Sequence, residues 1–140
     1  MEQIIVKRSQ MVEFQINGTP AVGRKYNALE IPNISRNNIT VYGVEVFSAT
    51  QLAKTPNNNT VVAAANIHHI TLTLVDNNNL EFAYQIPAYS LVRSLNGGFI
   101  IPIQPRILNL TRSYIQLTGA GSMAASEVLA VNLYYDLIGE

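Results

Sequence analysis

Histidine is the residue type that most often binds metals or moves protons near neutral pH, and this chain has two, adjacent at His68 and His69. The pair opens a stretch with strand character. Adjacent side chains on a strand point to opposite faces, so the two rings would not share one metal ion. A His-x-His metal centre would need further histidines, and the chain has none. We expect one ring to face inward or an interface, the other to face outward, and no cofactor or metal.

Acidic residues and serines do not form a recognisable catalytic pattern. Asp76 and Asp136 are the only aspartates, and the seven glutamates are dispersed. A glycosidase needs two carboxylates converging on a cleft, and no flanking pattern indicates such a pair. No Gly-x-Ser-x-Gly elbow occurs, and Gly97-Gly98 leads into a proline-interrupted apolar run rather than a helix. We therefore expect the protein not to be an enzyme.

Tyrosine is the one aromatic type frequent enough to suggest a binding surface, with seven copies and no tryptophan. The candidates for stacking on a sugar are Tyr84, Tyr89, Tyr114, Tyr134 and Tyr135. Tyrosine is also a common strand residue, which favours the core or an interface. A carbohydrate- or receptor-binding β-sandwich module is the alternative function.

The composition favours association with other protein chains. Hydrophobic residues make up 48% of the chain, charged residues only 13%, and the formal net charge is +0. Few charges protect such a surface against association, so we expect a protein that works inside an assembly, as a homo-oligomer. The other interpretation is a surface made polar by Asn, Gln, Ser and Thr. Zero net charge does not favour nucleic acid as a partner, because that binding needs many basic residues.

The N-terminal stretch MEQIIVKRSQMVEF lacks the basic start and apolar run of a secretory signal. No stretch approaches the ~18 apolar residues of a membrane span. We expect a product made and kept in the cytoplasm, with no membrane span.

The segment 70–86, ITLTLVDNNNLEFAYQI, predicts a β-hairpin. In its first arm apolar residues alternate with threonine, which gives the strand one apolar face. The second arm is expected to direct one set of side chains to the same face: Leu80, Phe82, Tyr84 and Ile86. The Asp and three Asn between the arms are typical of a tight turn, with Asp76 bonding its own backbone.

The same alternation recurs along most of the chain. Further strands are expected at 4–7, 12–16, near 29–31, 38–48, with Gly43 as a possible bulge, 113–118 and 127–138. Residues 61–66 fit either a short helix or a strand. About eight strands and no long helix predict an all-β antiparallel sandwich or barrel, forming one domain over residues 1–140.

The predicted core comes from the inward positions of these strands. Its members are Phe14, Ile16, Leu72, Leu74, Phe82, Tyr84, Ile115, Leu117, Leu129, Val131 and Leu133.

The apolar segment 99–108, FIIPIQPRIL, is the expected interface. Two prolines remove ladder donors, so the segment is an edge strand or an extended arm. Its apolar surface needs a cover, either another subunit or the protein's own loops. The residues expected to touch a partner are Phe99, Ile101, Ile103 and Arg106.

Several of these features occur together in one class of proteins. They are the N-terminus without a signal, the eight strands, the Asn-rich turns at 57–59 and 77–79, the arm FIIPIQPRIL and the closing strand EVLAVNLYYDLI. In this pattern the chain resembles the small single jelly-roll virion proteins of icosahedral bacteriophages. The resemblance implies a jelly-roll β-sandwich that acts as a structural capsid or capsid-associated subunit. It also implies symmetric contacts with other capsid subunits, synthesis in the host cytoplasm and a final place in the virion.

Overall fold

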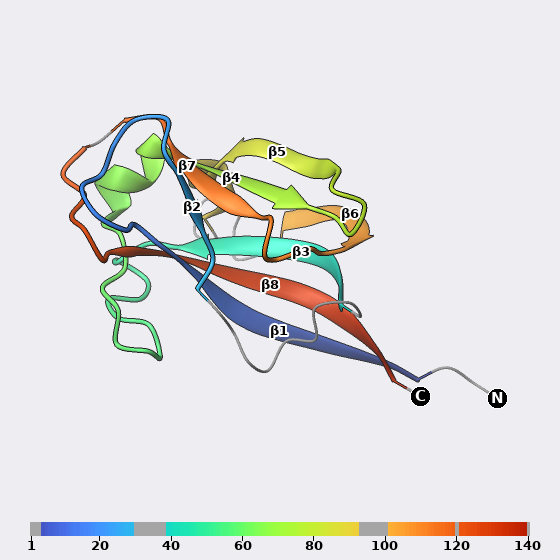
Figure 1. Cartoon of the computed structure of the whole chain (residues 1–140). Coiled ribbons are helices and arrows are strands. Elements are labelled where there is room, and N and C mark those ends of the chain that lie inside the picture. The colour runs from blue at the N-terminus through green and yellow to red at the C-terminus, as the bar shows by residue number, and fades with distance from the viewer. Residues whose placement is uncertain (1–3, 30–38, 93–100, 120, 140) are drawn as a thin grey trace.

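The computed structural model describes residues 4–29, 39–92, 101–119 and 121–139. Strands dominate it (Figure 1). They are β1 (Ile4–Gln15), β2 (Lys25–Asn27), β3 (Ile39–Phe47), β4 (Ile70–Val75), β5 (Glu81–Pro87), β6 (Ile101–Ile107), β7 (Tyr114–Leu117) and β8 (Val128–Gly139). Two short 3₁₀ helices, η1 (Ala64–His69) and η2 (Ala88–Leu91), follow β3 and β5. No helix in the described ranges has the length and apolar character to cross a membrane.

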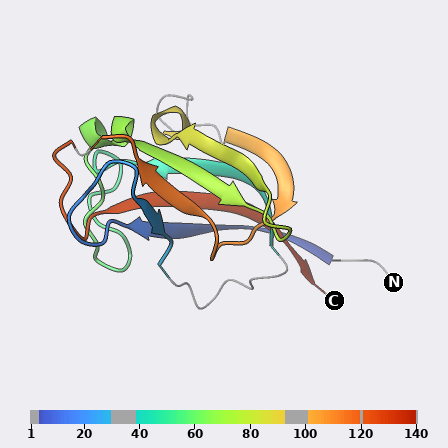
Figure 2. The same cartoon turned by 45° about the horizontal axis from the view of Figure 1, so that its top comes forward.

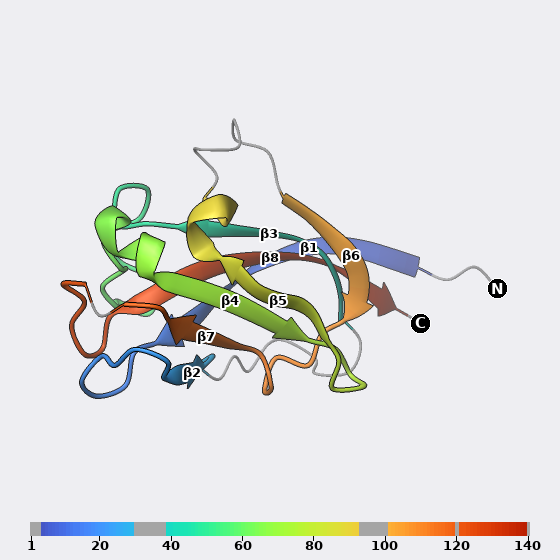
Figure 3. The same cartoon turned by 90° about the horizontal axis from the view of Figure 1, so that it is seen from above.

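The strands form two four-stranded antiparallel sheets, which confirms the all-β sandwich. Sheet A has the order β1-β8-β3-β6, and sheet B has the order β2-β7-β4-β5. Seen from above, β2, β7, β4 and β5 lie over the strands of sheet A (Figure 3). The start of β1 and the end of β8 pair at one end of the sandwich, while η1 lies at the other end (Figure 2).

The strand pairs are nested. β1 pairs with β8, β2 with β7, β3 with β6, and β4 with β5. Successive pairs alternate between the sheets, because the first and third belong to sheet A and the second and fourth to sheet B. The chain therefore follows the path of one long ribbon with the β4–β5 hairpin at its tip, rolled into two layers.

The turn of that hairpin has the predicted chemistry. Oδ1 of Asp76 accepts hydrogen bonds from the backbone N–H groups of Asn78 and Leu80, both at 2.9 Å. Asn79 adopts a positive φ of 61°, a conformation that Asn tolerates better than most residues.

Most of the predicted core is confirmed. The buried members are Phe14, Ile16, Leu72, Leu74, Ile115, Leu117, Leu129, Val131 and Leu133. Phe82 is half-buried and packs against this core. Tyr84 was wrongly assigned to the core, because its side chain is 58% exposed.

A bulge in β5 explains the error at Tyr84. Leu72 pairs with Ile86 and Leu74 pairs with Ala83, so β5 has one more residue than β4 between the two pairs. Gln85 takes a positive φ of 47° there. The extra residue shifts the alternation, and the buried position of β5 becomes Ala83. Leu80, also expected on the apolar face, is 54% exposed and lies in the turn just before β5.

Other boundaries also differ from the expectations. The segments predicted at 4–7 and 12–16 fall on the single strand β1, which ends at Gln15. The strand expected near 29–31 lies mostly outside the described residues, and the structure has an additional short strand before it, β2 at Lys25–Asn27. The register of β3 shifts between Val41 and Gly43, so the expected bulge is present there.

Candidate functional site

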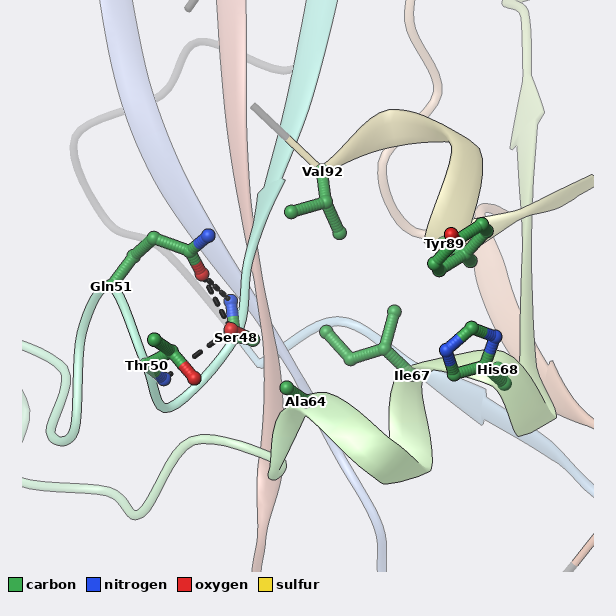
Figure 4. A pocket seen from close by; sticks show the side chains of 8 residues that line it. All are labelled: Ser48, Thr50, Gln51, Ala64, Ile67, His68, Tyr89 and Val92. Atoms are coloured by element: carbon green, nitrogen blue, oxygen red, sulfur yellow. Dashed lines mark hydrogen bonds between the residues drawn. The ribbon is translucent and has the colours of Figure 1, made fainter. Parts of the chain in front are cut away.

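A pocket with apolar, polar and aromatic lining residues lies at the end of the sandwich where η1 lies (Figure 4). Its walls are the turn that follows β3, helix η1 and helix η2, and its volume is about 200 Å³. We call it the η1–η2 pocket. Its lining residues are Ser48, Thr50, Gln51, Ala64, Ile67, His68, Tyr89 and Val92.

The polar wall of the pocket is a turn whose own residues hydrogen-bond to one another. The Ser48 hydroxyl donates to Oε1 of Gln51, and the Ser48 backbone N–H donates to the same oxygen at 2.8 Å. The Thr50 backbone N–H donates to the Ser48 hydroxyl oxygen at 3.3 Å. His68 lies across the pocket from this turn (Figure 4). The Ser48 hydroxyl is thus held by an amide and not by an imidazole base, which is not the arrangement of an activated nucleophile.

The opposite wall is an aromatic pair. The rings of His68 and Tyr89 lie with centroids 4.1 Å apart and planes inclined by 31°. His68 is exposed, and Tyr89 is 43% exposed. Between the two walls, the floor is formed by Ile67 and Val92, both buried. The pocket therefore combines an apolar floor, a polar turn and an aromatic wall.

The two histidines were expected on a strand, but they lie at the end of η1. Their rings still contact different parts of the protein. His68 stacks on Tyr89, whereas His69 is half-buried and packs on the loop between β7 and β8. A Cβ added to Gly119 would lie 2.9 Å from Nδ1 of His69, so only glycine allows this approach without a shift. Within the described residues, no three His, Cys, Asp or Glu side chains gather as a metal site would require.

A second polar site lies on the outer face of sheet A, where Glu13 is 5% exposed. Its Oε1 accepts from the Thr55 hydroxyl at 2.7 Å and from Nδ2 of Asn59 at 2.8 Å. Its Oε2 accepts from Nδ2 of Asn57 at 2.6 Å. Asn57 and Asn58 are exposed, and the loop that carries them is held to the sheet through this carboxylate. Nothing in the local sequence around Glu13 indicates its burial.

Another buried carboxylate, that of Glu45, lies on the same outer face. Glu45 is fully buried and accepts hydrogen bonds from Nδ2 of Asn132 at 3.2 Å and from the Tyr134 hydroxyl. Tyr134 therefore serves as a donor to a carboxylate. Tyr114 and Tyr135 are buried, so among the five candidate sugar platforms the exposed rings are those of Tyr84 and Tyr89.

The structure describes the backbone position of some of the predicted interface residues. Strand β6, which contains Ile101, Ile103 and Arg106, lies at the edge of sheet A. Phe99 lies outside the described residues. The edge position agrees with the expectation from the two prolines, and the interface itself stays a prediction.

Comparison with known proteins adds no relative: no family model, no curated protein and no solved structure matches this chain.

Proposed function

We propose that this chain is a jelly-roll subunit of a virion, a capsid or capsid-associated protein that assembles through symmetric contacts and catalyses no reaction. The observation that carries the proposal is the nested pairing of eight strands, β1 with β8 inward to β4 with β5, alternating between two four-stranded sheets. Eight strands in two sheets with doubled Greek-key connections are the jelly-roll arrangement, which viral capsid proteins share with lectins and cupins. Fold alone therefore does not decide among these functions.

The composition favours the virion subunit among these functions. Only 13% of residues are charged and the net charge is +0, so little electrostatic repulsion opposes the packing of identical copies. Neutral polar contacts and apolar contacts would then hold the copies together. Host cytoplasm as the place of synthesis and the virion as the final location follow from this role.

The four edge strands of the two sheets indicate how copies of the chain would contact one another. β6 carries Pro102 and Pro105, β2 has three residues, and the pairing of β5 is interrupted by bulges. The remaining edge strand, β1, carries the adjacent cations Lys7 and Arg8. Prolines, short strands, bulges and charges all oppose the addition of a foreign strand. We therefore expect copies to meet through apolar side chains, including those of β6, rather than through continuous sheets.

The test is the oligomeric state. Size-exclusion chromatography with light scattering over a concentration series, followed by electron microscopy, should show closed symmetric assemblies. A single monomeric species at the highest concentration would overturn the proposal.

The interface on β6 is tested by the double substitution Ile101→Ser with Ile103→Ser. It should shift the assembly toward monomer while the circular dichroism spectrum stays that of a folded β protein. Leu80→Ser is the matched control, because Leu80 is an exposed aliphatic residue at the β4–β5 turn. If the double variant assembles normally, or if its monomer unfolds, the interface lies elsewhere.

A further inference from the structure

Among the residues that the structure describes, none lining the η1–η2 pocket is an Asp, Glu, Lys or Arg. A phosphate, a carboxylate or a metal ion would meet no permanently charged side chain among them, and burying an unpaired charge is unfavourable. The pocket is therefore suited to a neutral ligand.

The pocket also has hydrogen-bonding capacity beside its apolar floor. Among the described residues, the Thr50 hydroxyl, the Tyr89 hydroxyl and the ring nitrogens of His68 make no hydrogen bond. Ile67 and Val92 form the floor, only 1% and 7% exposed. A purely aliphatic group would contact the floor but leave the three polar side chains without partners. The ligand that fits has one apolar face and several hydroxyl groups.

The volume of the pocket suits a ligand portion of about one ring. About 200 Å³ equals the space of roughly seven water molecules and is below the range of about 300 to 1,000 Å³ typical of drug-sized ligands. A single six-membered sugar ring is of this order, and a folded peptide segment is larger.

From these features we propose that the η1–η2 pocket binds a neutral pyranose sugar. The C–H face of the sugar packs on the Tyr89 ring, which His68 supports from its other side at 4.1 Å. The sugar hydroxyls exchange hydrogen bonds with the Thr50 hydroxyl. This binding goes beyond the assembly role and does not depend on it, because none of the lining residues belongs to β6.

The test is an NMR titration of the ¹⁵N-labelled protein with the methyl glycosides of glucose, galactose and mannose. At least one glycoside should shift the amide resonances of 48–51, η1 and η2 in a saturable way. N-acetylneuraminic acid, which is a charged sugar, should not. Because methyl glycosides mimic a linked sugar, their binding would indicate the end of a glycan chain, and binding of the free sugars alone would indicate a monosaccharide ligand.

Substitutions assign the binding to the pocket. Tyr89→Ala should raise the dissociation constant about tenfold through the loss of ring contact. Thr50→Val, at an exposed turn position, should raise it about fivefold through the loss of one hydrogen bond. Tyr84→Ala is the matched control, because Tyr84 is an exposed tyrosine outside the pocket, and its effect should be nil.

Three results would overturn the proposal. The first is that no neutral sugar, either free or as its methyl glycoside, shifts the pocket resonances. The second is that binding survives both Tyr89→Ala and Thr50→Val. The third is that a leucine-containing peptide binds while every sugar fails, which would assign the pocket to a partner's side chain instead.

Discussion

At the scale of single residues, Glu13 shows how a carboxylate can hold a loop. Its two oxygens accept three hydrogen bonds from Thr55, Asn57 and Asn59, although it lies on a strand of the sandwich. The bonds fold the loop 51–59 over the outer face of sheet A. Beneath that loop a small apolar cluster forms around Val61, Val128 and Ala130. The carboxylate thus compensates for its own burial by satisfying donors of the loop.

Glu13→Gln tests this role. Glutamine has the same shape, but one acceptor oxygen becomes an N–H donor that faces another donor. Leaving a buried donor unsatisfied costs about 1–3 kcal/mol, so the free energy of unfolding in urea should fall by that amount. The control is Glu81→Gln: Glu81 is exposed on β5 and accepts one hydrogen bond, from the Tyr114 hydroxyl, which the glutamine oxygen can also accept, so the free energy of unfolding should change by less than about 0.5 kcal/mol. Equal stability of the Glu13 variant and the wild type would contradict the role of the carboxylate.

At the scale of elements, β8 and β5 show when alternation predicts burial. β8 pairs with β1 and β3, and its side chains from Leu129 to Tyr135 alternate between core and outer face as expected. β5 pairs only with β4, at an edge of sheet B. A bulge is tolerated at that edge, and it shifts Tyr84 from the core to the surface.

Two alanine substitutions distinguish these strands. Leu133→Ala on β8 removes a side chain that is 1% exposed and should lower the free energy of unfolding by about 2–5 kcal/mol. Tyr84→Ala on β5 removes a larger side chain that is 58% exposed and should lower it by no more than about 0.5 kcal/mol. Chemical denaturation of both variants measures the difference. A melting temperature unchanged by Leu133→Ala would show that the inward face of β8 is misassigned.

At the scale of the whole molecule, the nested pairing makes β8 essential to sheet A. It lies between β1 and β3 and is the partner of both. Residues from the two ends of the chain thus meet directly, with Ile4 opposite Gly139. Contacts so distant in sequence form late, because the entropy of closing a long loop must be overcome first.

A chain ending at Glu127 should therefore fail to fold. β1 and β3 would lose their shared partner, and the core would lose Leu129, Val131 and Leu133. The ¹H–¹⁵N spectrum should lose its dispersion, and a peptide of residues 128–139 added in trans should restore it. A peptide of the same composition in scrambled order is the control. A dispersed spectrum of the truncated chain alone would show that sheet A forms without its central strand.

The fold class, the hairpin and most of the core could be predicted from the amino-acid sequence. Period-two alternation and turn chemistry act over a few residues, so 70–86 and the inward positions of β8 could be predicted locally. The described part of the apolar 99–108 segment, β6, lies at a sheet edge as expected, because two prolines exclude a central strand.

The pairing of the strands, and with it the position of each site, depends on contacts between residues far apart in the sequence. The burial of Glu13 and Glu45 depends on what covers the outer face of sheet A, which no local pattern encodes. The η1–η2 pocket joins residues 48–51 to His68 and Tyr89, which come together only when β3, β4 and β5 are in their sheets. The exposure of Tyr84 follows from a one-residue bulge, and such a shift reverses a strand's faces without altering its composition.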